Sequence, residues 1–102
     1  MADYRAVART TEIPEGGMKP VSLDDKRLLV CHTLGHFYVI DNTCSHDDGT
    51  LTDGFLDGTA IECPRHGARF DVTNGKVLCL PAAVPIRSYP VKVEGDQVLA
   101  AI

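Results

Sequence analysis

The sequence of 102 residues has no tryptophan, few aromatic residues and no long apolar run. No stretch approaches the roughly 20 apolar residues that cross a bilayer, and the N-terminus lacks the apolar core of a signal peptide. Ten Lys and Arg against 14 Asp and Glu give a formal net charge of -4, whereas nucleic acids and anionic membranes bind basic patches. We therefore expect a cytoplasmic protein whose partner is neither a nucleic acid nor a membrane.

Common enzyme motifs are also absent. The chain has no phosphate-binding loop, no glycine-rich dinucleotide motif, no HExxH histidine pair and no GxSxG nucleophile turn. A chain of this length forms one hydrophobic core, so we expect a single domain over residues 1–102. The sequence therefore predicts a small protein that is not itself an enzyme.

Short apolar and β-branched segments, separated by turn residues, predict a fold without long helices. Three pairs of segments flank turns and are predicted hairpins: 28–32 with 36–40, 68–72 with 76–80, and 89–94 with 97–102. Shorter predicted strands are 5–8, 18–23 and 59–62. This pattern is typical of an all-β protein, either an antiparallel β-sandwich or a partly open barrel.

Two short segments each contain one cysteine and one histidine. Cys44 and His46 form a C-x-H pair, and after sixteen residues Cys63 and His66 form a C-x-x-H pair. In a reducing compartment, cysteine beside histidine indicates a metal more often than a disulfide. Tetrahedral zinc accepts these four ligands, but zinc fingers usually place two cysteines on one segment and two histidines on the other. A two-iron cluster with two thiolates on one iron and two imidazoles on the other explains the mixed pairs better.

The two pairs, their spacing and the Gly67 that follows resemble the Rieske iron-sulfur signature. Pro64, the run 67–71, the Asn74-Gly75 turn and the loop at Pro81 are also similar to the small Rieske-type ferredoxins of bacterial ring-hydroxylating oxygenase systems. The resemblance extends over most of the chain. It implies a Rieske-like antiparallel β-sandwich or partly open barrel with a small cluster-binding subdomain carried on two loops.

The same resemblance implies one Rieske-type [2Fe-2S] cluster, with the cluster-binding subdomain at approximately residues 43–85. By the family pattern, Cys44 and Cys63 hold the inner iron. His46 and His66 then hold the outer iron near the surface, where an imidazole edge offers a short route for an electron. Electron exchange, and not substrate chemistry, is the expected activity.

The reduction potential is expected to be low. Respiratory-chain Rieske proteins typically add a disulfide between the two loops and hydroxyl donors from Ser and Tyr to the cluster sulfurs. At the corresponding positions this chain has Gly49 and Arg65 instead of cysteines, and Ala68 and Phe70 instead of hydroxyl donors. Because hydrogen bonds to sulfur stabilise the more negative reduced cluster, their loss lowers the potential.

The resemblance implies a soluble one-electron carrier from a ferredoxin reductase to a terminal oxygenase, such as an aromatic-ring dioxygenase. Residues 41–71 hold seven acidic and two basic side chains, a net charge of -5 within a chain of -4. Either these Asp residues are only turn formers, or some of them steer partners towards the His46/His66 tip. The candidates for steering are Asp47, Asp48, Asp53 and Asp57.

Three other functions stay open at this point. The chain could be a tightly bound Rieske subunit of a larger enzyme, an iron-sulfur sensor, or a structural zinc-binding interaction module. The bound metal separates the zinc module from the others. A stable complex with a native partner separates the subunit, and cluster-dependent binding to a regulator separates the sensor.

The remaining cysteines and histidines have structural interpretations. Cys31 lies in an apolar segment and is expected to be buried and unreactive. Cys79 precedes a proline-containing loop and either packs in the core or shields the cluster. His32 and His36 are assigned to a hairpin and not to a metal-binding helix. Two arginines beside the predicted ligands are expected to form solvated salt bridges: Arg65 and Arg69.

Overall fold

The computed structural model describes residues 3–43, 50–63, 67–79 and 84–102. Within these ranges, eleven strands form three antiparallel sheets, and the short 3-10 helix η1 (Thr10–Glu12) follows the first strand. The lower sheet has the order β1 (Tyr4–Arg9), β11 (Gln97–Ala101) and β10 (Val91–Glu94). The middle sheet has the order β2 (Met18–Leu23), β3 (Lys26–Thr33), β4 (His36–Asp41) and β9 (Ser88–Tyr89). The upper sheet has the order β5 (Phe55–Asp57), β6 (Ala60–Glu62), β7 (Arg69–Asp71) and β8 (Val77–Cys79).

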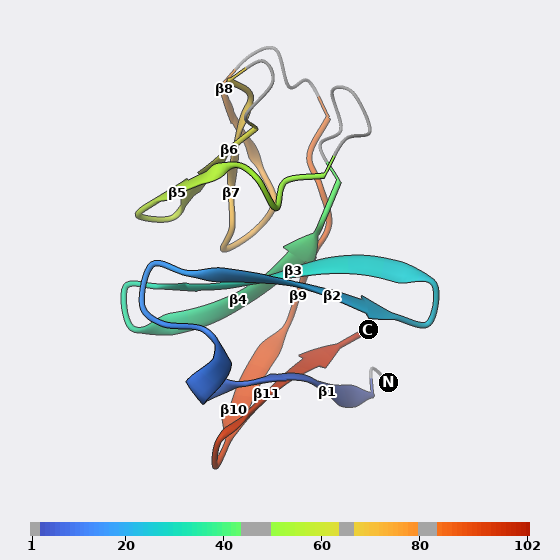
Figure 1. Cartoon of the computed structure of the whole chain (residues 1–102). Helices are drawn as coiled ribbons and strands as arrows, with labels where there is room; N and C mark the ends of the chain where they lie inside the picture. The colour runs from blue at the N-terminus through green and yellow to red at the C-terminus, as the bar shows by residue number, and fades with distance from the viewer. Residues whose placement is uncertain (1–2, 44–49, 64–66, 80–83) are drawn as a thin grey trace.

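The three sheets follow one another along the long direction of the molecule, with the middle sheet between the other two (Figure 1). The strand orders are open, so none of the three sheets closes on itself. The predicted all-β class, with antiparallel pairing and no closed barrel, is therefore confirmed. Among the described residues, no helix has the length and apolar character to cross a membrane.

The hairpin predicted around residues 33–35 is confirmed as β3 and β4. Thr33 pairs with His36, and the two residues between them, Leu34 and Gly35, have φ angles of 52° and 76°. Positive φ at both central positions matches the twist of the strands on either side. The Glu15 carboxylate accepts hydrogen bonds from the backbone N–H groups of Leu34 (2.7 Å) and Gly35 (2.9 Å), which stabilises this turn.

The other two predicted hairpins form around Asn74-Gly75 and Gly95-Asp96, but the prediction of one continuous strand over 89–94 is wrong. Pro90, which lies between β9 and β10, has no N–H to donate to a sheet. β9 pairs with β4 in the middle sheet, whereas β10 pairs with β11 in the lower sheet. The sequence analysis also missed β5, because a strand of three residues shows too little alternation to be recognised.

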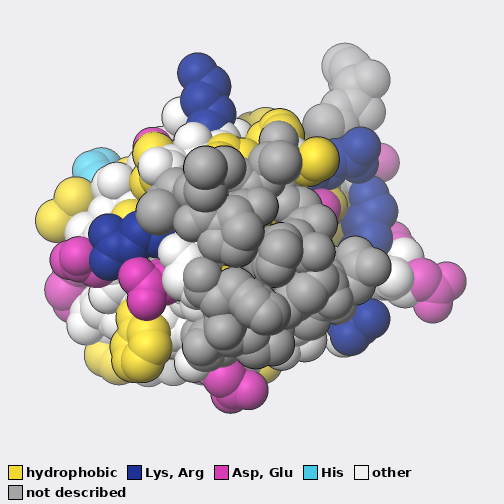
Figure 2. Space-filling view, turned by 90° about the horizontal axis from the view of Figure 1, so that it is seen from above, with side chains coloured by type: hydrophobic (Ala, Val, Ile, Leu, Met, Phe, Trp, Pro, Cys, Tyr) yellow, Lys and Arg dark blue, Asp and Glu magenta, His cyan; other side chains and the backbone are white. Residues whose placement is uncertain are grey.

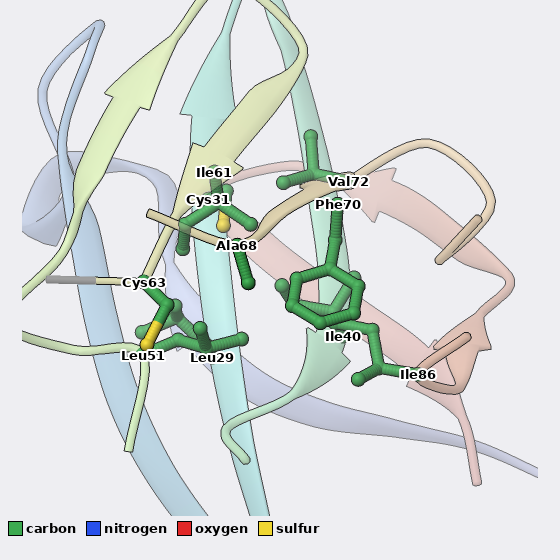
Figure 3. Packing of buried hydrophobic residues seen from close by; sticks show 10 residues of the cluster. All are labelled: Leu29, Cys31, Ile40, Leu51, Ile61, Cys63, Ala68, Phe70, Val72 and Ile86. Atoms are coloured by element: carbon green, nitrogen blue, oxygen red, sulfur yellow. The ribbon is translucent and has the colours of Figure 1, made fainter. Parts of the chain in front are cut away.

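Two hydrophobic cores lie between the layers, and not the single core expected from the chain length; β3 contributes side chains to both. Because successive residues of a strand point to opposite faces, Leu28 and Val30 enter the lower core, and Leu29 and Cys31 enter the upper core. All four side chains are fully buried. Burial of each leucine side chain contributes about 1.5–3 kcal/mol. Figure 3 shows the upper core: Leu29, Cys31, Ile40, Leu51, Ile61, Cys63, Ala68, Phe70, Val72 and Ile86.

Gly75 lies in the β7–β8 turn and contacts the segment that precedes β9. Its φ is 77°, and its carbonyl oxygen accepts a hydrogen bond from the backbone N–H of Ile86 at 3.0 Å. A Cβ atom at this position would lie 1.9 Å from the Ile86 carbonyl oxygen. Only glycine therefore allows these two backbones to approach so closely.

Gly75→Ala is expected to destabilise the protein by about 3 kcal/mol, because it adds a backbone clash to the strain of a positive φ. Gly95→Ala is the matched control, since Gly95 has a φ of 60° and no heavy atom within 4 Å of the added Cβ. The control is expected to lose about 1 kcal/mol. Chemical denaturation followed by circular dichroism measures both losses. Equal losses in the two variants would show that the Ile86 backbone moves away at no cost.

Candidate metal centre

Of the four predicted ligands, Cys63 belongs to the described part of the chain. Cys44, His46 and His66 lie outside the described residues. Other positions named in the sequence predictions also lie outside them: Asp47, Asp48, Gly49, Pro64, Arg65 and Pro81. The described residues that border these segments define where each ligand pair enters and leaves the fold.

Cys63 directly follows β6 and begins a turn that is closed by backbone hydrogen bonds. Its N–H donates to the Ala68 carbonyl oxygen at 2.7 Å, and its carbonyl oxygen accepts from the Gly67 N–H at 3.1 Å. Gly67 has a φ of 74°, a conformation that glycine adopts without the cost that a side chain imposes. The described residues on either side of segment 64–66 are therefore hydrogen-bonded to one another.

The segments that flank the two ligand pairs are in contact at Gly54. The Gly54 N–H donates to the Leu51 carbonyl oxygen at 2.9 Å. A Cβ on Gly54 would lie 2.1 Å from the carbonyl oxygen of Glu62 and 3.0 Å from that of Leu51. Leu51 lies just beyond the segment 44–49, and Glu62 lies just before Cys63. The close approach at Gly54 therefore holds the end of the first ligand segment against the beginning of the second.

A third segment, 80–83, begins and ends at the same end of the molecule. It follows β8, and the chain returns at Ile86, which is hydrogen-bonded to Gly75. In Figure 1 the described chain on either side of each of the three segments lies at the top, above the middle sheet. The tertiary structure thus places the described residues that border these three segments at one end of the molecule.

The surroundings of Cys63 are apolar. Cys63, Leu51 and Ala68 have no exposed surface and belong to the upper core (Figure 3). Ala68 and Phe70 stand where respiratory-chain Rieske proteins typically have hydroxyl donors; both are fully buried and carry no hydroxyl. A water-excluded thiol on a closed turn fits a thiolate ligand on the buried side of an iron-sulfur cluster. The donor types of the four predicted ligands, two thiols and two imidazoles, fit the asymmetric two-iron cluster.

The structure describes the whole of Cys31 but only the backbone of Cys79. Cys31 is a free thiol with no exposed surface, and burial raises its pKa to about 12. Because the thiolate is the reactive form, the prediction of a buried and unreactive Cys31 is supported. The backbone of Cys79 pairs with Arg69 in the upper sheet, but its side chain is outside the description. A shielding role for Cys79 stays a prediction.

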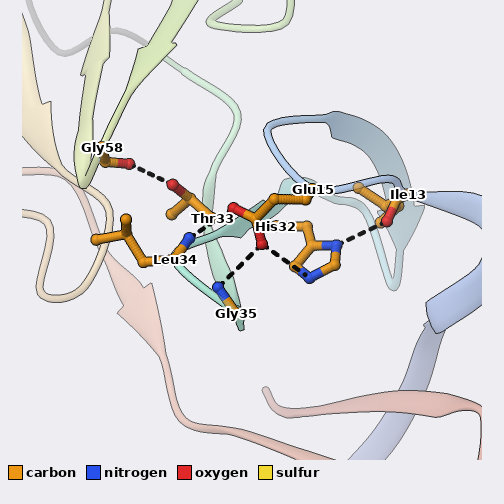
Figure 4. Close-up of polar contacts among 7 residues, drawn as sticks. All are labelled: Ile13, Glu15, His32, Thr33, Leu34, Gly35 and Gly58. Carbon is orange, nitrogen blue, oxygen red and sulfur yellow. Dashed lines mark hydrogen bonds and ion pairs between the residues drawn. The ribbon is translucent and has the colours of Figure 1, made fainter.

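His32 has a structural role, as the sequence analysis predicted. Its Nδ1 lies 2.8 Å from the Ile13 carbonyl oxygen, and its Nε2 lies 3.5 Å from a carboxylate oxygen of Glu15 (Figure 4). The imidazole ring stacks on Phe37 with 4.0 Å between the ring centroids. His36 is exposed at the end of the same hairpin, with its ring 6.2 Å from that of Tyr38. These contacts attach the hairpin to the loop before β2.

The acidic candidates in the described part of the chain are Asp53 and Asp57, both of which are exposed. Arg69 lies 3.7 Å from the Asp57 carboxylate and forms a 2.8 Å ion pair with Glu62. The predicted salt-bridge role of Arg69 is therefore confirmed. Figure 2, viewed towards the upper sheet, shows acidic and basic side chains next to one another at the rim of this face.

The sequence analysis missed two residues that build this end of the molecule. These residues are Gly54 and Asn42, neither of which the sequence analysis singles out. Asn42 is 4% exposed, and its side chain is hydrogen-bonded to Leu51 and Thr52. The available signal was a polar residue between the predicted strand 36–40 and the predicted ligand Cys44.

Comparisons with known proteins match this arrangement. Residues 3–90 match the family described as the Rieske [2Fe-2S] domain. The chain is 46% identical to the ferredoxin component of the naphthalene 1,2-dioxygenase system of Pseudomonas aeruginosa, over 86% of this chain and 85% of that protein. It is also similar to the ferredoxin of carbazole 1,9a-dioxygenase from Nocardioides aromaticivorans IC177, with a TM-score of 0.92, 32% identity and 98% of each chain covered. The complex of reduced oxygenase and oxidized ferredoxin in carbazole 1,9a-dioxygenase matches with a TM-score of 0.90 and 31% identity, covering 96% of this chain and 92% of that chain.

Proposed function

This chain belongs to the Rieske [2Fe-2S] domain family, and on that premise we propose that it is a low-potential, one-electron carrier from a reductase to a terminal oxygenase. It contains one Rieske-type [2Fe-2S] cluster and is an electron-transfer component, not an enzyme. When bound, the cluster accepts and releases one electron at a time. The observation that carries the proposal is the buried Cys63 on its closed turn, held by the Gly54 contact against the border of the first ligand segment. The cytoplasmic location expected from the sequence is part of the proposal.

The proposed ligands are the two thiol and imidazole pairs: Cys44, His46, Cys63 and His66. The cluster-binding subdomain is placed at approximately residues 43–85, a range that includes the upper sheet. Cys63 supports the assignment because its thiol is buried among apolar side chains, where a thiolate needs a metal partner to balance its charge.

The ligand assignment is tested by metal analysis and by spectra before and after reduction with dithionite. The wild-type protein is expected to contain about two irons per chain and to give the visible absorption and reduced-state paramagnetic signal of a Rieske centre. Cys63→Ala and His66→Ala are expected to lose both. Cys31→Val is the matched control, because it removes a buried thiol of the same upper core and leaves the proposed ligands intact.

Three other outcomes would contradict the proposed cluster or its ligands. One tightly bound zinc in a colourless protein would make the chain a structural zinc module. A protein that stays colourless and free of iron after anaerobic reconstitution would also contradict the proposal. Retention of the complete Rieske spectrum in Cys63→Ala would contradict the ligand assignment alone.

The partners proposed are a ferredoxin reductase and a terminal oxygenase, which dock transiently near His46 and His66. The complex of an oxygenase with a similar ferredoxin supports the choice of partner. Steering by exposed acidic side chains raises association rates with a basic face and weakens as salt screens the charges. The four proposed steering residues are Asp47, Asp48, Asp53 and Asp57.

The structure distinguishes Asp53 from Asp57. Asp57 is near the Arg69 guanidinium, whereas Asp53 has no ion-pair partner within the described ranges. Asp53→Asn is therefore expected to lower the rate of electron transfer to the oxygenase by about threefold at low ionic strength, and Asp57→Asn by less. Stopped-flow measurements over a range of salt concentrations check this order. Rates that respond neither to salt nor to Asp53→Asn would exclude steering by Asp53.

The reduction potential is expected to lie near the low end of the Rieske range, about -150 mV. Ala68→Ser places a hydroxyl beside the Cys63 turn, and one new hydrogen bond of about 1 kcal/mol to sulfur would raise the midpoint by roughly 40 mV. Phe70→Tyr is expected to act in the same direction. Val72→Thr, which adds a hydroxyl to the same core away from the turn, is the control. Protein film voltammetry measures all four proteins, and a wild-type midpoint well above 0 mV would contradict the low-potential assignment.

A further inference from the structure

Asn42 is a buried polar side chain at the border of the first ligand segment. It directly follows β4, lies two residues before Cys44, and is 4% exposed. Its backbone N–H donates to the Arg27 carbonyl oxygen at 2.9 Å. This bond attaches Asn42 to β3, next to the buried residues of that strand. Within the described ranges, Asn42 and Thr33 are the two polar residues classed as buried.

The Asn42 side chain joins the two ends of the segment that carries Cys44 and His46. Its Oδ1 accepts a hydrogen bond from the Leu51 N–H at 3.0 Å, and its Nδ2 donates to the Thr52 Oγ1 at 2.6 Å. The Asn42 amide therefore uses both its acceptor oxygen and its donor nitrogen, and both partner residues follow the ligand segment in the sequence. Burial strengthens these bonds, because water does not compete for the same groups.

The contacts continue from Asn42 to the second ligand pair. Leu51 is fully buried in the upper core beside Cys63 (Figure 3). Its carbonyl oxygen accepts the Gly54 N–H, and Gly54 lies against the Glu62 carbonyl oxygen. Glu62 precedes Cys63. A continuous series of short contacts thus connects the beginning of one ligand segment with the beginning of the other.

We propose that Asn42 is a positioning residue for the [2Fe-2S] cluster: its side chain fixes the ends of the Cys44/His46 segment relative to Cys63. This inference rests on the ligand set proposed above. Ligands that are held before the metal binds lose less conformational entropy on binding, so the closed segment retains the cluster longer. Without the amide, the ends of the segment separate more easily and the two ligand pairs lose their fixed spacing.

Asn42→Leu tests the proposal, because leucine is similar in size and forms neither hydrogen bond. Thr33→Val is the matched control. The Thr33 hydroxyl donates to the Gly58 carbonyl oxygen at 2.7 Å (Figure 4), so this variant also removes a buried hydrogen bond to the backbone, but at the β5–β6 turn. Both holoproteins are challenged with an iron chelator, and the decay of the visible absorption is followed. The paramagnetic spectrum of the reduced cluster and thermal unfolding by circular dichroism are recorded in parallel.

Asn42→Leu is expected to lose its cluster about 10-fold faster than the wild type and to broaden the paramagnetic spectrum. Thr33→Val is expected to keep the wild-type rate and spectrum even where its thermal stability falls. Thr52→Val, which removes one of the two Asn42 contacts, is expected to fall between wild type and Asn42→Leu. It also keeps the test decisive should Asn42→Leu fail to fold. Wild-type cluster loss and spectra in Thr52→Val and Asn42→Leu, or equal acceleration in Thr33→Val, would overturn the positioning role.

Failure of the ligand assignment is distinguishable in the same assay. Cys44→Ala and His46→Ala are expected to hold no stable cluster. If these variants retained the wild-type cluster, the ligand set would be wrong and the positioning role would fall with it. If they lost the cluster while Asn42→Leu behaved like Thr33→Val, only the role of Asn42 would be overturned.

Discussion

The structure depends on a middle strand that is buried on both faces. β3 places Leu28 and Val30 in the lower core and Leu29 and Cys31 in the upper core. The three-residue strands of the upper sheet are too short to be stable without packing on a second layer. They obtain this layer from the upper face of the middle sheet. The upper sheet therefore packs on the same strand that also contributes to the lower core.

Above the middle sheet, the described residues that border each of the three segments are joined by a different kind of contact. Asn42 closes the first with a side-chain amide, and the backbones of Cys63 and Ala68 close the second. Gly75 and the backbone of Ile86 close the third. The described residues that border the three segments are therefore each fixed by hydrogen bonds within the fold.

Local patterns predicted much of the fold. Apolar alternation around Leu34-Gly35, Asn74-Gly75 and Gly95-Asp96 identified three hairpins, because a turn and the strands beside it are encoded by adjacent residues. The prediction failed where partners distant in sequence decide the outcome. The segment around Pro90 divides between two sheets because the distant β4 pairs with β9, whereas the adjacent β11 pairs with β10. β5 was missed for another reason: its partner β6 is adjacent, but three residues show too little alternation.

For the metal centre, the chemistry was predictable from local sequence: the residue types and spacing of two Cys/His pairs predict the cluster, and the buried, unreactive Cys31 follows from its apolar neighbours. The contacts around the ligand segments were not predictable in this way. Asn42 and Gly54 resemble ordinary turn residues until their contacts with Leu51 and Glu62 are known. Arg69 pairs with Asp57 across the sheet, which changes the effective charge of one acidic candidate and not of Asp53. Ligand chemistry resides in the side chains themselves, whereas burial, hydrogen-bond partners and local charge arise from residues that come together on folding.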